Sequence, residues 1–291
     1  MWGAVIGDII GSAFEHANHR SPFFELFRPD CRFTDDTVCT AAIADILLKH
    51  PDFSQINENN ASNELRLWCC TYLNRGFGSM FYQWIANAVN RSYGSYGNGA
   101  LMRISPVALF CVNRGYSREQ ALEVADLLTR ITHDHPQALK AVKLYVGVLY
   151  DLLQYKKENH QTMPVEDAKA LLAQNLIDFG YPQPETIEKY RVQIDFDVTC
   201  ETSLLVACTG IFESENFEDV MYKVVSVGGD SDTYAAIAGA LAEIIFEIPP
   251  HIMDSIKPYF RNYDEDLLIA IMSLYREVEP IKAEEVPDPT E

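Results

Sequence analysis

The chain has few of the features that mark secreted, membrane-bound or nucleic-acid-binding proteins. Its seven cysteines are odd in number and include no C-x-x-C pair, which is typical of reduced thiols in a cytoplasmic protein. No apolar run approaches the length of a membrane span, and the N-terminus lacks the basic segment of a signal peptide. Basic residues are scarce, since 23 Lys and Arg accompany 42 Asp and Glu and the net charge is −19. We therefore expect neither general nucleic-acid binding nor membrane binding, because both partners are anionic.

Alternation of apolar and polar residues with period two is also rare, and residues 192–198 form the best strand candidate. We expect the Asn-rich stretch 52–63 to be a loop. The sequence predicts an all-α fold, a single compact multi-helix globule over residues 1–278, and an acidic tail, 279–291, that we expect to be disordered. Helical periodicity recurs over 64–74, 80–90, 137–157, 165–179, 199–212, 217–225, 234–248 and 264–278.

Two acidic segments lie at opposite ends of the chain, and each precedes an apolar helical run. Residues 34–37 read T-D-D-T, and residues 228–233 read G-G-D-S-D-T. Thr34 and Asp230 are good N-cap residue types, and the carboxylates that follow would lie in a first helical turn. Either segment alone is most simply a helix cap. If the fold brings them together, four carboxylates converge and repel one another unless cations bind, and oxygen ligands suit Mg²⁺, Mn²⁺ or Ca²⁺ rather than zinc.

A third pattern lies near the start of the chain, where Gly3, Gly7 and Gly11 recur every four residues. On a helix these glycines form one ridge, and each costs about 1 kcal/mol relative to Ala, so we expect close packing against another helix. Asp8 and Glu15 are seven positions apart, which on a helix places them on one face near the ridge. The alternative is that both carboxylates point to solvent.

Five motifs follow one another along the chain, namely G-D-x-x-G-x-x-x-E at 7–15, T-D-D-T at 34–37, G-N-G-A-L-M-R at 97–103, T-H at 132–133 and G-G-D-S-D-T at 228–233. In this order they resemble the motifs of the ADP-ribosylglycohydrolases, which include dinitrogenase reductase-activating glycohydrolases and the ADP-ribosylarginine and ADP-ribosylserine hydrolases. The resemblance spans residues 3 to 249. It implies an all-α fold with two Mg²⁺ or Mn²⁺ ions in a cleft, and hydrolysis of the bond between ADP-ribose and a protein side chain, most familiarly arginine.

The resemblance also implies roles for individual residues. The implied metal ligands are Thr34, Asp35, Asp36, Asp230, Asp232 and Thr233. The implied substrate-binding residues are Gly97, Asn98, Gly99, Met102, His133, Gly229 and Ser231. The implied catalytic residues are Glu15, near the scissile bond, with Asp35 and Asp36.

Several assignments stay open at the level of sequence. Arg103 is either a phosphate contact or a buried structural residue, and Tyr93 and Tyr96 either stack on adenine or belong to the core. Some family members carry a further catalytic acid between the first acidic motif and the glycine loop. Residues 64–96 contain Glu64 but no aspartate, so that acid is not carried over. The acceptor is therefore open among arginine, serine and a free ADP-ribose derivative.

Two other classes of function deserve comparison. An all-α metal phosphohydrolase of the HD type would use His133 and Asp134 with further histidine ligands. A ligand-binding relative that has lost catalysis would bind ADP-ribose without cleaving it, although the complete acidic motifs argue against this. The expected partner is an ADP-ribosylated protein or derivative, and bacterial regulation, defence against an ADP-ribosylating toxin and nucleic-acid de-modification are all compatible with it.

Overall fold

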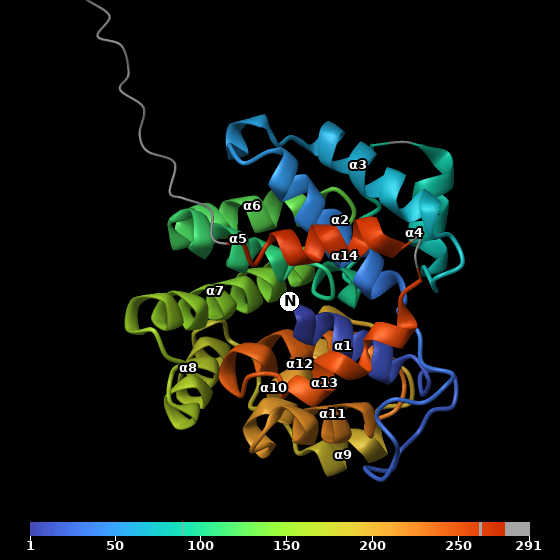
Figure 1. The fold of residues 1–291 in the computed structure, drawn as a ribbon, viewed down its shortest axis with the longest axis vertical. Helices are drawn as coiled ribbons and strands as arrows, with labels where there is room; N and C mark the ends of the chain where they lie inside the picture. Colours follow the sequence, from blue (N-terminus) through green and yellow to red (C-terminus); the bar gives the residue numbers. More distant parts are fainter. Residues whose placement is uncertain (89, 262–263, 277–291) are drawn as a thin grey trace, which may run out of the picture.

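The first helix and the acidic helix near the end of the chain pack together at the centre of the molecule. The structure is a computed structural model that describes residues 1–88, 90–261 and 264–276. Helix α1 (Trp2–Gly11) lies along α12 (Ser231–Ile245), and the two form the largest contact between helices. Figure 1 shows them side by side, with α2 (Asp35–Lys49) beyond α1 on the other side.

Glycine makes this central contact possible. A Cβ atom added to Gly3 would lie 2.0 Å from the carbonyl oxygen of Gly239, and one added to Gly7 would lie 2.0 Å from that of Ala235. At Gly11 an added Cβ would lie 2.4 Å from Cα of Asp232. Backbone therefore packs directly on backbone along three turns, as the spacing predicts, and the acidic start of α12 is held at the end of α1.

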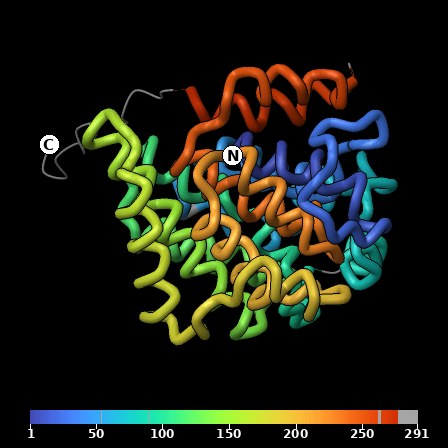
Figure 2. Tube along the Cα trace, turned by 90° about the horizontal axis from the view of Figure 1, so that it is seen from below, coloured from blue at the N-terminus to red at the C-terminus, as the bar shows by residue number. Residues whose placement is uncertain are grey.

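The remaining helices surround this pair. Figure 1 places α2, α3, α5 and α6 on one side of the molecule and α9, α10 and α11 on the other, and Figure 2 shows α13 and α14 along one edge. Their bounds are α3 (Glu58–Thr71), α4 (Ser79–Asn87), α5 (Pro106–Arg114), α6 (Arg118–Arg130), α7 (Pro136–Asn159), α8 (Val165–Asp178), α9 (Ile187–Gln193), α10 (Cys200–Glu213), α11 (Phe217–Val225), α13 (Pro250–Ser255) and α14 (Glu265–Ser273), with 3₁₀ turns at Phe53–Gln55, Asn98–Ala100 and Lys257–Tyr259.

The all-α prediction is confirmed, with fourteen α-helices in the part of the chain that the structure describes. The strand predicted at 192–198 is wrong, because α9 continues to Gln193 and the chain then forms a loop in which Phe196 and Val198 are exposed. The loop expected at 52–63 is wrong in its second half. Asn57 caps α3 by accepting hydrogen bonds from the backbone N–H groups of Asn59 and Asn60, so this Asn-rich sequence begins a helix.

Two further expectations concern the termini and the membrane. The predicted tail, 279–291, lies outside the described residues, as do 277–278 at the end of the expected last helix. Among the described helices, none is both long enough and apolar enough to cross a bilayer.

Candidate metal centre

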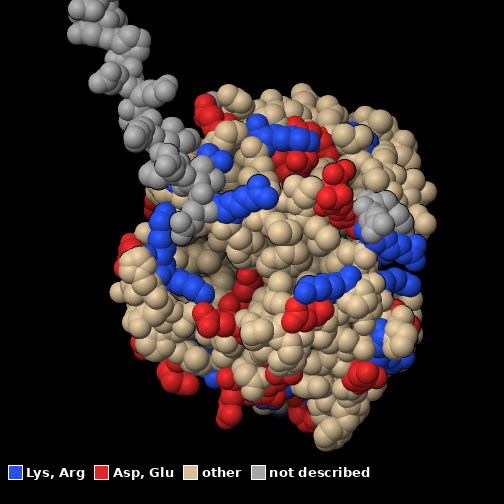
Figure 3. Space-filling model, in the orientation of Figure 1, with Lys and Arg blue, Asp and Glu red and all other residues tan. Residues whose placement is uncertain are grey.

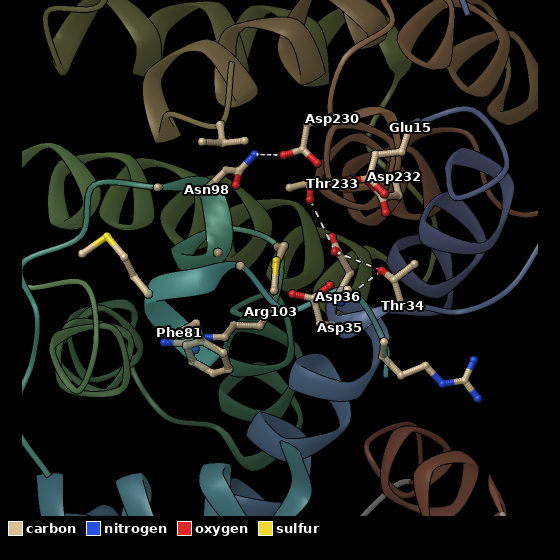
Figure 4. Close-up of a pocket in the computed structure, with 18 of the residues that line it drawn as sticks. Glu15, Thr34, Asp35, Asp36, Phe81, Asn98, Arg103, Asp230, Asp232 and Thr233 are labelled. Carbon is tan, nitrogen blue, oxygen red and sulfur yellow. Dashed lines mark hydrogen bonds between the residues drawn. The ribbon is translucent and has the colours of Figure 1, made fainter. Parts of the chain in front are cut away.

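The acidic ends of α2 and α12 meet at a cavity of ~360 Å³. Figure 4 shows the carboxylates between Asn98 on one side and Thr34 and Glu15 on the other. The segments 75–81 and 93–103 complete its walls. The two acidic motifs, 194 positions apart from Asp36 to Asp230, thus form one site, as the sequence predicted.

At the first motif, Thr34 is the N-cap of α2 and its hydroxyl oxygen accepts from the backbone N–H of Asp36 at 3.4 Å. The same hydroxyl donates to Asp8 at 2.6 Å. Asp8 also accepts from the backbone N–H groups of Thr34, at 2.9 Å, and Thr37, at 3.1 Å, and from the Thr37 hydroxyl. Asp8 thereby fixes the start of α2 against α1.

Asp8 is the site residue whose role the sequence left undecided. It is fully buried, so the solvent-exposed alternative is wrong, and its carboxylate lies next to those of Asp36 and Asp232. Because both of its oxygens already accept hydrogen bonds from the first turn of α2, we assign it to positioning the acidic motif rather than to direct ligation.

The second motif is shaped by contacts from distant segments. Gly228 and Gly229 have φ values of 78° and 66°, and this left-handed backbone turns the chain into α12. Asp230 takes the N-cap position but makes no capping hydrogen bond with its side chain. Its carboxylate instead accepts from the side-chain amide of Asn98 at 2.5 Å, so it points into the cavity. The Ser231 hydroxyl donates to the carbonyl of Gly11 at 2.9 Å and fastens α12 to α1.

Two groups of carboxylates in this cavity are close enough to share a cation. One comprises Asp8, Asp36 and Asp232, and the other Glu15, Asp230 and Asp232, with the oxygen atoms of each group within 4.8 Å of one another. Asp232 belongs to both groups. Asp36 Oδ1 is buried and has no hydrogen-bond partner among the described residues. An unpartnered buried carboxylate oxygen inside a set of oxygen donors fits a hard divalent cation.

The electrostatics agree with this interpretation. Burial, followed by repulsion from neighbouring carboxylates, raises the pKa values of Asp36 and Asp232 well above the usual range. Burial also raises the pKa of Asp35, with contributions from Cys39 and Asp8. Burial raises the pKa of Asp230 to about 6, despite the hydrogen bond from Asn98. Clustered acids that hold their protons this strongly are the ones that a bound cation would ionise.

Glu15 reaches the site by a different route from the one predicted. Helix α1 ends at Gly11, so Glu15 lies in the following turn, and the expectation that it shares a helical face with Asp8 is wrong. The turn nevertheless brings Glu15 to the cavity beside Asp230 and Asp232.

The glycine loop forms the opposite wall. The backbone N–H of Gly97 donates to the Ser95 hydroxyl at 3.1 Å, and that of Asn98 donates to the Val198 carbonyl at 2.7 Å. The loop therefore offers space rather than a row of free N–H groups. A Cβ atom at Gly99 would lie 3.3 Å from the buried ring of His133, and both His133 and Met102 line the cavity.

Arg103 and His133 are linked through Thr132, which accepts from Arg103 at 2.6 Å and lies 2.7 Å from Nδ1 of His133. Burial, and then the charge of Arg103, lowers the pKa of His133 well below its usual value, so this histidine is neutral. Arg103 is buried, as expected for a structural residue, and because it also lines the cavity a contact with a phosphate stays a prediction. Tyr93 is half-buried at the cavity wall, whereas Tyr96 is exposed and lies outside the lining.

A sequence model of the family described as ADP-ribosylglycohydrolase matches residues 1–280. The chain belongs to the ADP-ribosylglycohydrolase family. It is 22% identical to the ADP-ribosylarginine hydrolase Tri1 of Pseudomonas putida, over 88% of this chain and 72% of that protein. It is 28% identical to the ADP-ribosylhydrolase ARH3 of Danio rerio, over 82% of this chain and 80% of that protein. A solved structure titled ADP-ribosylglycohydrolase-related protein complex shares the fold, with a TM-score of 0.67, 22% identity and 95% of both chains covered.

Family membership and geometry together bear on the remaining expectations. The candidate metal clusters among the described residues contain no histidine, and Asp134 instead accepts from the Ser92 hydroxyl, so the HD-type alternative has no structural support. Gly229 and Ser231, predicted to bind substrate, lie outside the cavity lining. Gly229 forms the left-handed turn into α12, and the Ser231 hydroxyl holds that turn against α1.

Proposed function

We propose that this protein is a metal-dependent hydrolase that cleaves the glycosidic bond between ADP-ribose and an acceptor. The observation that carries the proposal is the pair of carboxylate clusters that share Asp232, adjacent to Glu15 in the cavity. The complete carboxylate set favours catalysis over the alternative of a relative that only binds ADP-ribose.

The oxygen donors that would hold two Mg²⁺ or Mn²⁺ ions are those of Thr34, Asp35, Asp36, Asp230, Asp232 and Thr233. When bound, such ions orient hydroxyl groups and lower the pKa of a water molecule. The Thr233 hydroxyl donates to Asp36 at 3.4 Å across the gap between α12 and α2, so both acidic motifs face the same volume. This all-oxygen donor set suits a hard cation rather than zinc, and the resemblance to the family favours Mg²⁺ or Mn²⁺ among the hard cations.

The protein's own residues would bind and orient the substrate and would move a proton. In the proposed pose the pyrophosphate lies along the Gly97–Gly99 loop beside His133, and the terminal ribose lies over the carboxylates. Glu15 would accept the proton of the attacking water at the carbon that loses the acceptor, and Asp35 and Asp36 would position that water. Glycoside cleavage passes through an oxocarbenium-like state and requires a carboxyl group near the reacting bond.

We propose a cytoplasmic location for this protein and an ADP-ribosylated partner. All seven cysteines are free, which agrees with a reducing, cytoplasmic location. On the face in Figure 3 the Lys and Arg side chains are interspersed with Asp and Glu, as expected for a protein that does not bind nucleic acids generally. We propose an ADP-ribosylated partner, and arginine is the acceptor that the resemblance to Tri1 favours. A role against an ADP-ribosylating toxin is compatible with this chemistry.

The proposal is tested with arginine-, serine- and nucleic-acid-linked ADP-ribose, incubated with the Mg²⁺- or Mn²⁺-loaded protein. We expect release of free ADP-ribose from at least one conjugate, measured by chromatography. Binding of the conjugates without release of ADP-ribose from any of them would instead identify a non-catalytic relative.

The role of Glu15 is tested by Glu15→Gln, which keeps the shape of the side chain but removes its capacity to take a proton. We expect kcat to fall by about 10²–10⁴, the usual contribution of a positioned acid or base, while free ADP-ribose binds within several-fold of the parent affinity. Glu25→Gln is the matched control, because Glu25 is exposed in the same connection between α1 and α2 and should leave kcat unchanged. A preserved kcat with a raised KM would show that Glu15 stabilises the bound substrate and the transition state equally and does not take part in proton transfer.

A further inference from the structure

Three buried polar side chains form a network behind the glycine loop. Nη2 of Arg103 donates to the Thr132 hydroxyl at 2.6 Å, and that hydroxyl lies 2.7 Å from Nδ1 of His133. Arg103 is 1% exposed, Thr132 is fully buried and His133 is 4% exposed. Arg103 and His133 line the cavity, whereas Thr132 does not. The Arg103–Thr132–His133 network therefore connects two points of the cavity wall through a residue that a ligand cannot touch.

The hydrogen atoms of this network have one arrangement in which all of them are paired. A guanidinium group only donates, so Thr132 is the acceptor in its bond with Arg103. In the described part of the chain the Thr132 hydroxyl bonds only to Arg103 and His133. Its own hydrogen is therefore paired only if it points to Nδ1, because a buried hydroxyl hydrogen without an acceptor is unfavourable. Nδ1 is then an acceptor, and the proton of the neutral ring is on Nε2.

The surroundings of His133 also keep its ring neutral. Burial, and then the positive charge of Arg103, lowers the pKa of His133 well below its usual value. An imidazolium ring would also present a second N–H to the Thr132 hydroxyl, whose own hydrogen would then lose its acceptor. The Tyr93 ring packs against the imidazole with centroids 5.8 Å apart, which restricts rotation of the ring. Position and protonation of this histidine are thus determined together.

Nε2 of His133 faces the glycine loop and the cavity. A Cβ atom added to Gly99 would lie 3.3 Å from Nε2, and one added to Gly97 would lie 3.9 Å from it. Nδ1 has Thr132 as its partner, whereas Nε2 has no hydrogen-bond partner among the described residues. The two glycines leave open the space in front of Nε2, so an atom of a ligand can reach it.

The charge of Arg103 determines which kind of acceptor suits this position. Its guanidinium group lies 5.8 Å from the centroid of the Phe81 ring, beside which Figure 4 shows it. Its Nε is buried and has no hydrogen-bond partner within the described ranges. Burial of a cation is costly without an anion nearby. An oxygen that carries negative charge would therefore accept from Nε2–H and also be stabilised by the charge of Arg103.

We infer that Arg103 and Thr132 are positioning residues that hold His133 as a neutral Nε2–H donor, directed at an anionic oxygen of the ligand. The inference rests on the proposed function and deepens it, because in the proposed pose the oxygen beside His133 belongs to the pyrophosphate of ADP-ribose. Arg103 then acts on the ligand through Thr132 and His133 and through its charge.

The protonation of His133 is measured directly by NMR spectroscopy of the ligand-free protein with ¹⁵N-labelled histidine. The ring nitrogen resonances distinguish the two neutral tautomers from each other and from the imidazolium, and the His133 signals are identified by their loss in His133→Gln. At neutral pH we expect a proton on Nε2 and none on Nδ1. In Thr132→Val both neutral tautomers should be populated, because Nδ1 loses its donor, and Thr132→Ser should restore the parent spectrum.

Binding of ADP-ribose to the metal-loaded protein is measured by calorimetry. Thr132→Val should weaken binding by about tenfold or more, because the donor to a charged oxygen is no longer fixed, and Thr132→Ser should restore it. KM should rise with little change in kcat, since this contact is present in both the ground state and the transition state. Thr129→Val is the matched control. It removes a buried hydroxyl that donates to the Ala125 carbonyl at 2.6 Å, three positions before Thr132, and should leave the affinity unchanged.

The outcomes separate this inference from the proposed function. An Nδ1–H tautomer or an imidazolium in a parent protein that cleaves its conjugate would overturn the inference and leave the hydrolase intact. Equal affinities of Thr132→Val and Thr129→Val, or a loss in Thr132→Val that Thr132→Ser does not restore, would have the same consequence. A parent protein that neither binds ADP-ribose nor cleaves any conjugate would overturn the proposed function, and with it the anionic ligand of His133, whichever tautomer is observed.

Discussion

Removal of divalent cations is expected to abolish turnover and to lower the melting temperature of the protein. Asp36, Asp230 and Asp232 are buried beside the half-buried Glu15, and without a cation burial and their clustering raise their pKa values, which costs stability near neutral pH. A cation present at 100 times its dissociation constant stabilises the folded state by about 2.7 kcal/mol, and that contribution disappears with a chelator. Activity and melting are measured before chelation, after it, and after Mg²⁺ or Mn²⁺ is restored.

Asp36→Asn separates this mechanism from a general loss of stability. In chelated protein the variant should melt at a higher temperature than the parent, because it removes a buried carboxyl group that without a cation must either repel its neighbours or take up a proton. In excess Mg²⁺ the order should reverse, and activity should be lost, because an amide is a weaker ligand for a hard cation.

Asp254→Asn serves as the control for that variant, since the Asp254 side chain is 71% exposed and pairs with Lys257 on the surface. It should change neither activity nor melting beyond about 0.5 kcal/mol. Full activity in chelated parent protein would contradict the metal centre.

Gly7→Ala is expected to cause a large loss of stability, although it adds only one methyl group. The new Cβ would lie 2.0 Å from the carbonyl oxygen of Ala235 and 2.3 Å from its carbon, and neither backbone atom can move without displacing α12. We expect a loss of about 3 kcal/mol or more, although alanine alone favours a helix by about 1 kcal/mol. For a chain of this size the melting temperature should fall by about 6 °C or more, measured by calorimetry.

The control is Gly78→Ala, since Gly78 has φ of −57° and no atom within 4 Å of an added Cβ. Its melting temperature should stay within about 2 °C of the parent. If the melting temperature of Gly7→Ala were equal to that of Gly78→Ala, or higher, α1 and α12 would not pack through this glycine ridge.

The parts of the fold that the sequence predicts are those governed by local rules. Thr34 caps α2 as its residue type indicates, and the spacing of Gly3, Gly7 and Gly11 correctly forecasts a close helix contact. The convergence of the two acidic motifs is also confirmed. That expectation rests on the likeness of the two acidic motifs and on the order of the motifs along the chain, not on any local preference.

The parts that the sequence does not predict depend on contacts between distant residues. Asp230 has the residue type of a capping side chain, yet its carboxylate bonds to Asn98, 132 positions away in the chain. Asp8 carries no local sign that it would accept hydrogen bonds from the start of α2. The sequence predicts Glu15 on the first helix, but that helix ends at Gly11. The turn that follows has no periodicity from which the direction of the Glu15 side chain could be predicted.

The contact between α1 and α12 also determines when the site can exist during synthesis of the chain. Thr34, Asp35 and Asp36 are made early, but the ligands at the start of α12 reach them only after α12 has emerged and its backbone lies on that of α1. Until then the nascent chain holds half of the cation ligands and an uncovered row of glycines. A cation therefore cannot template the early stages of folding, and its capture marks the completion of a contact between residues more than 200 positions apart.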